Sequence, residues 1–307
     1  MQRPLFLMSL PRAGSTLVQR VLAAHDQIAT ASEPWLLLPQ IYIIKGRGMY
    51  AEYNQRLATE ALSDFMQELP GGPDDYFAEL RQFVLQLYRR ASRDGAHYFL
   101  DKTPRYHLVA ADVFRLFPDA KFIFLWRNPL AVVSSLVETW AGGKWSPHRW
   151  RVDLFDGLAN LVSAYEGHAD EVCAVRYEDL ISSPEASWPR LFEYLEIPFD
   201  PESLTGFQRV ELKGRMGDPS GSRQYQALSK EPLKKWMRSL DNPFRKAWCR
   251  RYLNWVGEHR LSLMGYCLDD LLRELEGMPV RPRRLGSDVA RAAYGQALTA
   301  WRKAALN

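Results

Sequence analysis

Two short segments of this 307-residue chain carry residue types that bind phosphate groups. The first is residues 9–16, with the sequence SLPRAGST, which lies between an apolar run and a helical pattern. Backbone amides of a glycine-containing turn, followed by a helix N-terminus, form a cradle for an anion. Arg12 adds a planar guanidinium that matches phosphate, and the hydroxyls of Ser15 and Thr16 add donors. The segment therefore predicts an anion site, although an ordinary turn with a helix cap at Ser15 or Thr16 is the alternative.

The second segment begins at Arg127, directly after the apolar run FIFLW at residues 122–126. An ATP-binding loop reads GxxxxGK[ST], but here Ser9 stands at the first glycine and Ser15 stands at the lysine. ATP-binding proteins also need an acidic ligand for Mg²⁺, whereas Arg127 ends the second run and can hold only another anion. The two segments predict two anion sites and no metal site, which fits a nucleotide phosphorylated at both its 5′ and 3′ positions.

Short apolar runs alternate with helical patterns and would position these segments. The periodicity predicts helices over 17–25, over 108–117 and from 129 to about 140. Each predicted strand ends in a polar cluster before a helix, which indicates an α/β fold with a central parallel sheet flanked by helices. Ligands of such sheets bind beyond the carboxyl ends of the strands. The predicted strands are 5–10, 98–100, 122–126 and 172–175.

We expect one domain over residues 1–278, with a helical insertion at 36–96. The insertion contains two helical segments separated by the breaker Pro70-Gly71-Gly72-Pro73. Residues 204–229, rich in Gly, Arg, Ser and Asp, predict a long functional loop. A basic linker and a C-terminal helix would form residues 279–307. The predicted helices outside the core alternation are 53–69, 76–91, 244–259, 268–275 and 287–305.

The composition excludes several classes of protein. A net charge of +4 suits an anionic ligand but is too small to indicate nucleic-acid binding. Three widely spaced cysteines without a CxxC pair argue against a disulfide framework or a zinc site and favour a reducing compartment. No apolar run of about 18 residues occurs, and residues 5–10 are too short for a signal peptide, so we expect a cytoplasmic protein without a membrane span.

Five segments together resemble the sulfotransferase family that uses 3′-phosphoadenosine 5′-phosphosulfate. The resemblance covers about residues 4–236 and is closest to the branch with protein-tyrosine and many bacterial sulfotransferases. It implies a P-loop-like fold and transfer of a sulfuryl group to an acceptor hydroxyl or amine, with 3′,5′-adenosine bisphosphate as the product. The segments are SLPRAGSTLVQRVLAAH, Ser32-Glu33-Pro34, Asp101-Lys102-Thr103-Pro104, WRNPLAVVSSL and Val175-Arg176-Tyr177-Glu178-Asp179-Leu180.

The resemblance also implies which residues bind the donor nucleotide. Arg127 and Ser135, eight residues apart, match the motif that holds the 3′-phosphate, with Asn128 where the family often has Asp. The residues that would hold the 5′-phosphosulfate are Arg12, Ala13, Gly14, Ser15 and Thr16.

Glu33 lies 21 residues after Arg12, the interval at which the tyrosyl-protein branch carries its catalytic glutamate. By this resemblance Glu33 would be the general base that takes the acceptor proton. Lys102, with Arg12 as a second cation, would stabilise charge on the oxygen that bridges sulfur and the 5′-phosphate. His107 is the rival base. It lies three residues beyond the position where a histidine is expected, which Pro104 occupies here. A histidine at this place more often packs in the structure or faces solvent.

Several assignments stay open. Tyr177 contacts the adenosine or belongs to the core, and Lys230 competes with Lys213, Arg215 and Arg223 for a contact with the nucleotide. The acceptor is a small molecule, a lipid or a carrier-bound group, and the oligomeric state is not readable. The rival functions are a P-loop kinase that uses ATP and a non-catalytic nucleotide-binding protein. Residues that line an acceptor pocket or simply form core are Trp35, Leu36, Leu37, Tyr42, Trp140, Trp145 and Trp150.

Overall fold

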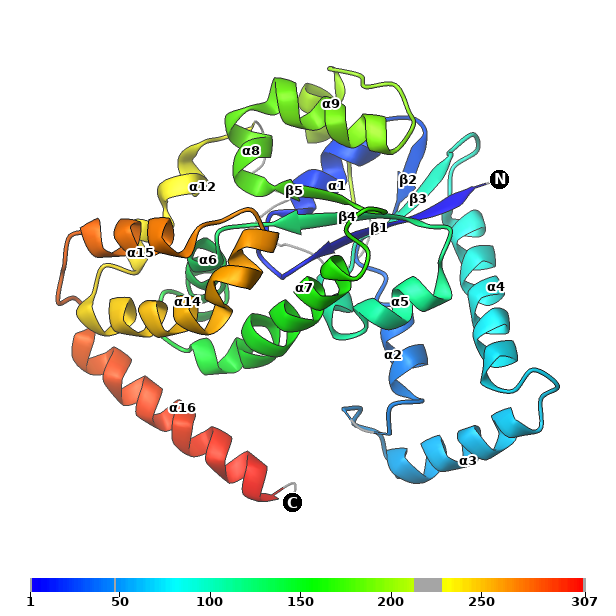
Figure 1. The fold of residues 1–307 in the computed structure, drawn as a ribbon, viewed down its shortest axis with the longest axis horizontal. Helices are drawn as coiled ribbons and strands as arrows, with labels where there is room; N and C mark the ends of the chain where they lie inside the picture. The colour runs from blue at the N-terminus through cyan, green and yellow to red at the C-terminus, as the bar shows by residue number, and fades with distance from the viewer. Residues whose placement is uncertain (1, 47, 213–227, 306–307) are drawn as a thin grey trace.

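A computed structural model describes residues 2–46, 48–212 and 228–305, and a parallel β-sheet lies at its centre (Figure 1). Within the described residues the sheet has five strands in the order β2-β3-β1-β4-β5, and every adjacent pair is parallel. The predicted α/β class is therefore confirmed. The sequence patterns missed β2, which is only three residues long. The strands are β1 (Arg3–Ser9), β2 (Ile28–Thr30), β3 (Tyr98–Asp101), β4 (Lys121–Trp126) and β5 (Cys173–Arg176).

The central strands are buried on both faces, which explains why they read as continuous apolar runs. In β1, Leu5 and Leu7 belong to one core cluster, whereas Phe6 and Met8 belong to the cluster on the opposite face. One face is covered by α1 (Ser15–Ala23), α8 (Tyr177–Ser182) and α9 (Pro184–Tyr194) (Figure 1). The other is covered by α5 (Ala110–Leu116), α6 (Pro129–Ala141), α7 (Leu158–Glu166) and α14 (Pro243–Leu263).

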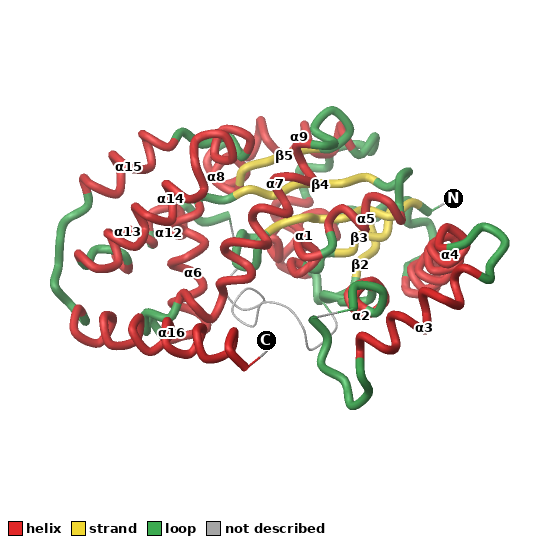
Figure 2. Tube along the Cα trace, turned by 60° about the horizontal axis from the view of Figure 1, so that its bottom comes forward, coloured by secondary structure: helices red, strands yellow, loops and turns green. Residues whose placement is uncertain are grey.

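The region between β2 and β3 is helical, as the sequence pattern indicates. It contains α2 (Leu37–Tyr42), α3 (Gln55–Gln67) and α4 (Pro73–Ala91). The side chain of Asn54 caps α3 by accepting a hydrogen bond from the Leu57 amide. Pro73 ends the Pro-Gly-Gly-Pro breaker and is also the first residue of α4, a position that proline favours. Figure 2 shows α3 and α4 at one end of the molecule, with α14 and α16 at the opposite end.

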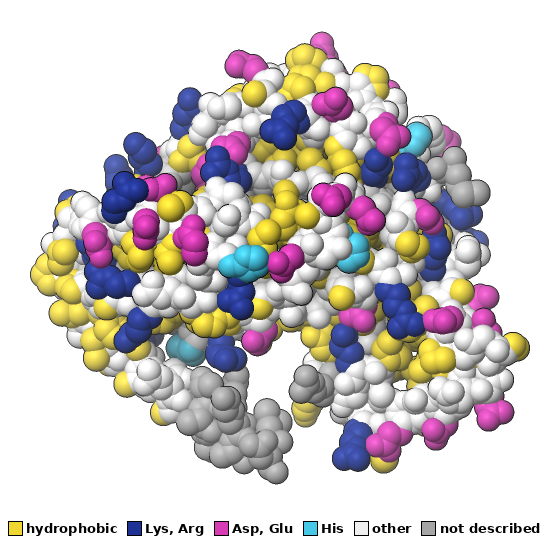
Figure 3. All heavy atoms as spheres, viewed as in Figure 1, with side chains coloured by type: hydrophobic (Ala, Val, Ile, Leu, Met, Phe, Trp, Pro, Cys, Tyr) yellow, Lys and Arg dark blue, Asp and Glu magenta, His cyan; other side chains and the backbone are white. Residues whose placement is uncertain are grey.

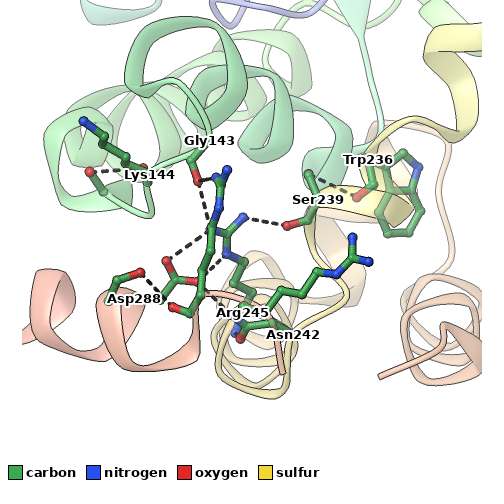
Figure 4. Close-up of polar contacts among 11 residues, drawn as sticks. Gly143, Lys144, Trp236, Ser239, Asn242, Arg245 and Asp288 are labelled. Carbon is green, nitrogen blue, oxygen red and sulfur yellow. Dashed lines mark hydrogen bonds and ion pairs between the residues drawn. The ribbon is translucent and has the colours of Figure 1, made fainter. Parts of the chain in front are cut away.

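The C-terminal helix α16 (Leu285–Ala305) is anchored by a buried ion pair (Figure 4). Arg245 Nε lies 2.7 Å from Asp288 Oδ2, and the two side chains are 5% and 1% exposed. Arg245 also donates to the carbonyls of Gly143 and Ser239, and Asn242 Nδ2 donates to Asp288. Because both charges are paired and hydrogen-bonded, their burial is tolerated. The same end of the fold contains α12 (Glu231–Lys234), α13 (Trp236–Ser239) and α15 (Leu268–Gly277).

The surface carries both signs of charge. In Figure 3, Lys and Arg side chains are interspersed with Asp and Glu side chains over the visible face rather than gathered into one basic field. On this face the distribution agrees with the small net charge of the chain. Of the helices in the described part of the chain, none has the length and apolar character needed to cross a bilayer.

Candidate active site

The sequence-predicted residues follow the carboxyl ends of all five strands. Arg12 follows β1, Glu33 follows β2, Lys102 follows β3, Arg127 follows β4 and Tyr177 follows β5. Because the strands are parallel, these ends meet at one edge of the sheet, where ligands of α/β proteins bind. The strand order separates them into two groups, with β2 and β3 on one side of the β1 loop and β4 and β5 on the other.

The loop after β1 forms a tight turn into α1. The Ala13 amide donates to the Leu10 carbonyl at 3.2 Å, and Arg12 and Gly14 have left-handed φ values of 69° and 97°. Gly14 is the N-cap of α1, so the expectation of a cap at Ser15 or Thr16 is wrong, and both lie in the first helical turn. A Cβ atom on Gly14 would come within 2.4 Å of the Tyr177 ring. Only glycine meets both requirements at this position.

A cleft of about 630 Å³ brings the two predicted anion segments together. Arg12, Arg127 and Ser135 are among its lining residues. Arg127 Nη1 donates to the Arg12 carbonyl at 2.8 Å, and Arg12 Nε donates to Ser135 Oγ at 3.2 Å. The loop after β1 and the start of α6 therefore hold each other in place. The lining holds three basic residues, with Lys235 as the third, against the two glutamates Glu138 and Glu231, so the excess of positive charge favours an anionic ligand.

Tyr177 supports Arg127 in this cleft. The guanidinium carbon of Arg127 lies 4.4 Å from the centre of the Tyr177 ring, and Tyr177 is 1% exposed. The ring thus packs as core beside Gly14 and also lines the cleft. Arg127 Nε is buried and lacks a hydrogen-bond partner among the described residues. An unused donor on a residue that lines the cleft fits a bound phosphate oxygen.

Among the described residues of the C-terminal half, Lys235 is the basic residue that lines the cleft. Lys230 is exposed and lies outside the residues that line the cleft, whereas Lys235 lines it together with Trp236. Trp236 is 2% exposed, so it anchors the adjacent lysine. In the sequence, the feature that distinguishes Lys235 is the tryptophan that follows it in KKW. Lys213, Arg215 and Arg223, the competitors of Lys230, lie outside the described residues.

Glu33 and Lys102 form an ion pair at the ends of β2 and β3. Lys102 Nζ lies 2.7 Å from Glu33 Oε1, and the two side chains are 1% and 13% exposed. The second carboxylate oxygen, Oε2, accepts a hydrogen bond from Trp35 Nε1 at 3.2 Å. The pair does not line the cleft described above but lies on the other side of the β1 loop. The pair places a proton acceptor next to a cation. These are the two groups that acid–base chemistry at a bridging oxygen needs.

His107 lies in the core. It is fully buried in the 3₁₀ helix Pro104–Leu108, and its Nε2 is 2.8 Å from Asp153 Oδ1. Burial lowers the pKa of His107, which opposes the charged form. Asp153 also pairs with Arg105 at 3.1 Å. This surrounding fits a structural histidine and does not support its role as the rival base.

The candidate residues for an acceptor pocket differ in how deeply they are buried. Leu37, Trp145 and Trp150 belong to the core. Trp140 is 40% exposed, and its ring centre lies 6.0 Å from the guanidinium carbon of Arg12. Trp35, Leu36 and Tyr42 are partly buried against the core. Trp140 is therefore the best-placed apolar surface beside the cleft.

Asp101, at the end of β3, has a perturbed pKa. Burial raises its pKa from 3.8 to about 6, against the opposing effect of hydrogen bonds from Tyr88, Tyr106 and Thr103 and of the charge on Lys102. The folded state consequently binds more protons than the unfolded state between about pH 4 and pH 6. In that window the free energy of unfolding falls as the pH rises, by on the order of 3 kcal/mol for this group.

The substitution Asp101→Asn is expected to remove this dependence on pH. Urea unfolding at pH 4 and pH 7 would be compared for the wild type and the variant. From pH 4 to pH 7 the wild type should lose more stability, or gain less, than Asp101→Asn, because the other carboxyl groups cancel in the comparison. Equal changes in the two proteins would contradict the raised pKa.

Comparisons with known proteins identify the family of this chain. The family model described as "Sulfotransferase family" matches residues 4–201. Protein-tyrosine sulfotransferase 1 of Danio rerio is 24% identical over 289 residues, which cover 92% of this chain and 72% of that protein. The nodulation protein NoeE of Sinorhizobium fredii is 32% identical over 139 residues, which cover 44% of this chain but only 31% of NoeE.

The fold is also similar to that of a solved structure. The sulfotransferase domain from the curacin biosynthetic pathway aligns with a TM-score of 0.55 and 22% identity, over 83% of this chain and 98% of that domain. The segments that matched the family in sequence are those that surround the cleft and the Glu33–Lys102 pair. Because the family match covers well over half of its length, this chain belongs to the sulfotransferase family.

Proposed function

We propose that the chain transfers a sulfuryl group from 3′-phosphoadenosine 5′-phosphosulfate to a hydroxyl or amine of its acceptor. The observation that carries this proposal is the cleft in which Arg127, from the end of β4, donates to the carbonyl of Arg12 in the β1 loop. Two anion-binding segments thus meet in one cleft, as a nucleotide with 5′ and 3′ phosphate groups requires. The buried Arg127 Nε, which lacks a partner among the described residues, supports the fit.

The residues divide into two groups for binding. Arg12 and the amides of Gly14, Ser15 and Thr16 would hold the 5′-phosphosulfate at the N-terminus of α1, while the Ala13 amide keeps its bond to the Leu10 carbonyl in the turn. Arg127 and Ser135 would hold the 3′-phosphate, and Lys235 would add a charge from the opposite wall. Tyr177 keeps Arg127 in place through the contact of its ring.

The Glu33–Lys102 pair supports the chemical step. When bound, the donor supplies the sulfuryl group, whose bond to the 5′-phosphate oxygen breaks as the acceptor oxygen or nitrogen bonds to sulfur. Glu33 takes the proton that the acceptor loses. Lys102, with Arg12, stabilises the negative charge that develops on the departing 5′-phosphate oxygen. The electron pair leaves with that oxygen, so the products are the sulfated acceptor and 3′,5′-adenosine bisphosphate.

Fewer observations bear on the acceptor than on the donor, so the proposed acceptor covers several classes of molecule. We propose a small hydroxylated molecule, a lipid or a carrier-bound group, because Trp140 beside Arg12 offers an exposed apolar surface. Its identification needs a functional assay. Labelled sulfate would be transferred from the donor into a cell extract, and the labelled product would be identified by mass spectrometry.

Calorimetry tests the donor directly. The purified chain should bind 3′,5′-adenosine bisphosphate in the absence of divalent cations and should not bind Mg-ATP with comparable affinity, because Ser15 stands where an ATP loop has lysine. Uptake of Mg-ATP without binding of the bisphosphate would overturn the proposal in favour of a kinase. Normal binding of the bisphosphate without any labelled product would favour a non-catalytic nucleotide-binding protein.

A further inference from the structure

Asp101 is a buried acceptor for three hydroxyl groups. Its Oδ2 accepts from Tyr88 at 2.6 Å and from Tyr106 at 2.9 Å, and its Oδ1 accepts from Thr103 Oγ1 at 2.9 Å. The side chain is 1% exposed. An ionised carboxylate can only accept hydrogen bonds, so each of these hydroxyl protons must point at Asp101.

Two of the three hydroxyls reach further, to the loop between β2 and α2, taken here to include Leu37, the first residue of α2. With their protons directed at Asp101, their lone pairs are available to accept. Thr103 Oγ1 accepts from the Trp35 amide at 3.3 Å, and Tyr106 Oη accepts from the Leu37 amide at 3.2 Å. Asp101 therefore sets the direction of two hydrogen-bond relays that end on the backbone of this loop.

The loop that receives these bonds carries Glu33. Trp35 has a left-handed φ of 55°, a strained conformation for a non-glycine residue that persists only where neighbouring contacts impose it. In this conformation Trp35 Nε1 reaches Glu33 Oε2, while Lys102 Nζ reaches Glu33 Oε1. The orientation of the Glu33 carboxylate thus depends on a backbone conformation that the two relays hold.

We propose that Asp101 is a positioning residue, which fixes the Glu33 carboxylate through the relays Thr103–Trp35 and Tyr106–Leu37. The catalytic part of this inference rests on the proposed function of Glu33. The positional part concerns the loop alone. A misplacement of about 1 Å in a reacting group can cost on the order of 100-fold in rate, so the relays matter for turnover even though they touch no substrate.

Two matched substitutions test the relays. Tyr106→Phe and Tyr88→Phe each remove one hydroxyl that donates to the same oxygen of Asp101, and both side chains are buried, at 1% and 3% exposure. Only the Tyr106 hydroxyl also binds the loop. Hydrogen exchange of the peptide that contains residues 35–37 should accelerate by about 3- to 10-fold in Tyr106→Phe, the value of one neutral hydrogen bond, and should stay unchanged in Tyr88→Phe.

Transfer of labelled sulfate into a cell extract provides the second measurement. Tyr106→Phe should lower the rate by on the order of 10-fold at saturating donor, with unchanged affinity for 3′,5′-adenosine bisphosphate, whereas Tyr88→Phe should retain the rate. Equal exchange and equal rates in the two variants would overturn the positioning role. Accelerated exchange only in Tyr106→Phe without a loss of rate would leave the relays intact as structure but would overturn their catalytic role.

Failure of this inference is distinguishable from failure of the proposed function. If Glu33→Gln retains full turnover, Glu33 is not the base, whatever the exchange of residues 35–37 reports. If Glu33→Gln abolishes turnover but the two tyrosine variants behave alike, Glu33 is the base and Asp101 does not position it.

Discussion

Replacement of Glu33 by glutamine is expected to lower the rate of sulfuryl transfer by about 10²- to 10⁴-fold, the range that general-base catalysis supplies. The amide cannot take a proton from the acceptor. Its oxygen can still accept from Lys102 Nζ or from Trp35 Nε1, which now bind the two carboxylate oxygens. The measurement is the initial rate of labelled-sulfate transfer into a cell extract at saturating donor.

The affinity for 3′,5′-adenosine bisphosphate separates this effect from a loss of structure. Glu33 does not line the cleft that holds Arg12 and Arg127, so the dissociation constant should be nearly unchanged in Glu33→Gln. Removal of one partner from a buried ion pair destabilises the fold, and thermal unfolding would report that cost. Turnover equal to that of the wild type would refute the assignment of the base.

A matched control removes a carboxylate from another ion pair. Glu276 pairs with Arg250 at 3.1 Å on the surface, where the side chains are 56% and 50% exposed. Exposed pairs contribute little to stability, so Glu276→Gln should retain both stability and rate. A comparable loss of rate in this control would show that the assay responds to any loss of a carboxylate and not to the base.

The sequence predicted the fold best at the strands that are buried on both faces of the sheet. The apolar runs that predicted strands at 5–10 and 122–126 correspond to β1 and β4, the two central strands. Both are followed by loops whose polar residues we propose to bind an anion. The meeting of Arg12, Arg127 and Ser135 could therefore be expected from the sequence, because adjacent parallel strands end at the same edge.

The Glu33–Lys102 contact could not be derived from spacing alone. The two residues are 69 positions apart, and they meet because β2 pairs with β3 at the edge of the sheet. β2 is too short to give a periodic signal, so its neighbours could not be inferred. The relays from Asp101 were hidden for a similar reason, since Tyr88 lies in α4, whereas Thr103 and Tyr106 belong to the start of the 3₁₀ helix after β3. Hydrogen bonds between such residues depend on packing that no local pattern encodes.

Lys235 illustrates a different limit of prediction from the sequence. The segment after residue 227 contains several lysines, and the choice among them depends on which side chain is next to a buried anchor. Lys230 has no such anchor, whereas Lys235 precedes Trp236, which packs under α6. Helical periodicity does not distinguish them, because α12 and α13 are each only four residues long.

Replacement of Arg127 by alanine is expected to remove the preference for a nucleotide with a 3′-phosphate. A charge-assisted hydrogen bond contributes about 1.5–3 kcal/mol, so affinity for 3′,5′-adenosine bisphosphate should fall by about 10- to 100-fold. Affinity for 5′-AMP should fall much less, because that ligand lacks the 3′-phosphate that we propose Arg127 to bind. Calorimetry with both nucleotides measures the ratio of their dissociation constants.

The ratio of the two dissociation constants, rather than either affinity alone, decides the outcome, because Arg127 also supports the structure of the cleft. Its guanidinium donates to the Arg12 carbonyl and packs on the Tyr177 ring, and a loss of these contacts would weaken both nucleotides. Arg12→Ala is the matched control, since a residue that binds the shared 5′-phosphate should weaken both ligands by the same factor. If Arg127→Ala behaves in the same way as Arg12→Ala, then Arg127 supports the cleft but does not recognise the 3′-phosphate, and the chain has no basis for choosing this donor over other adenine nucleotides.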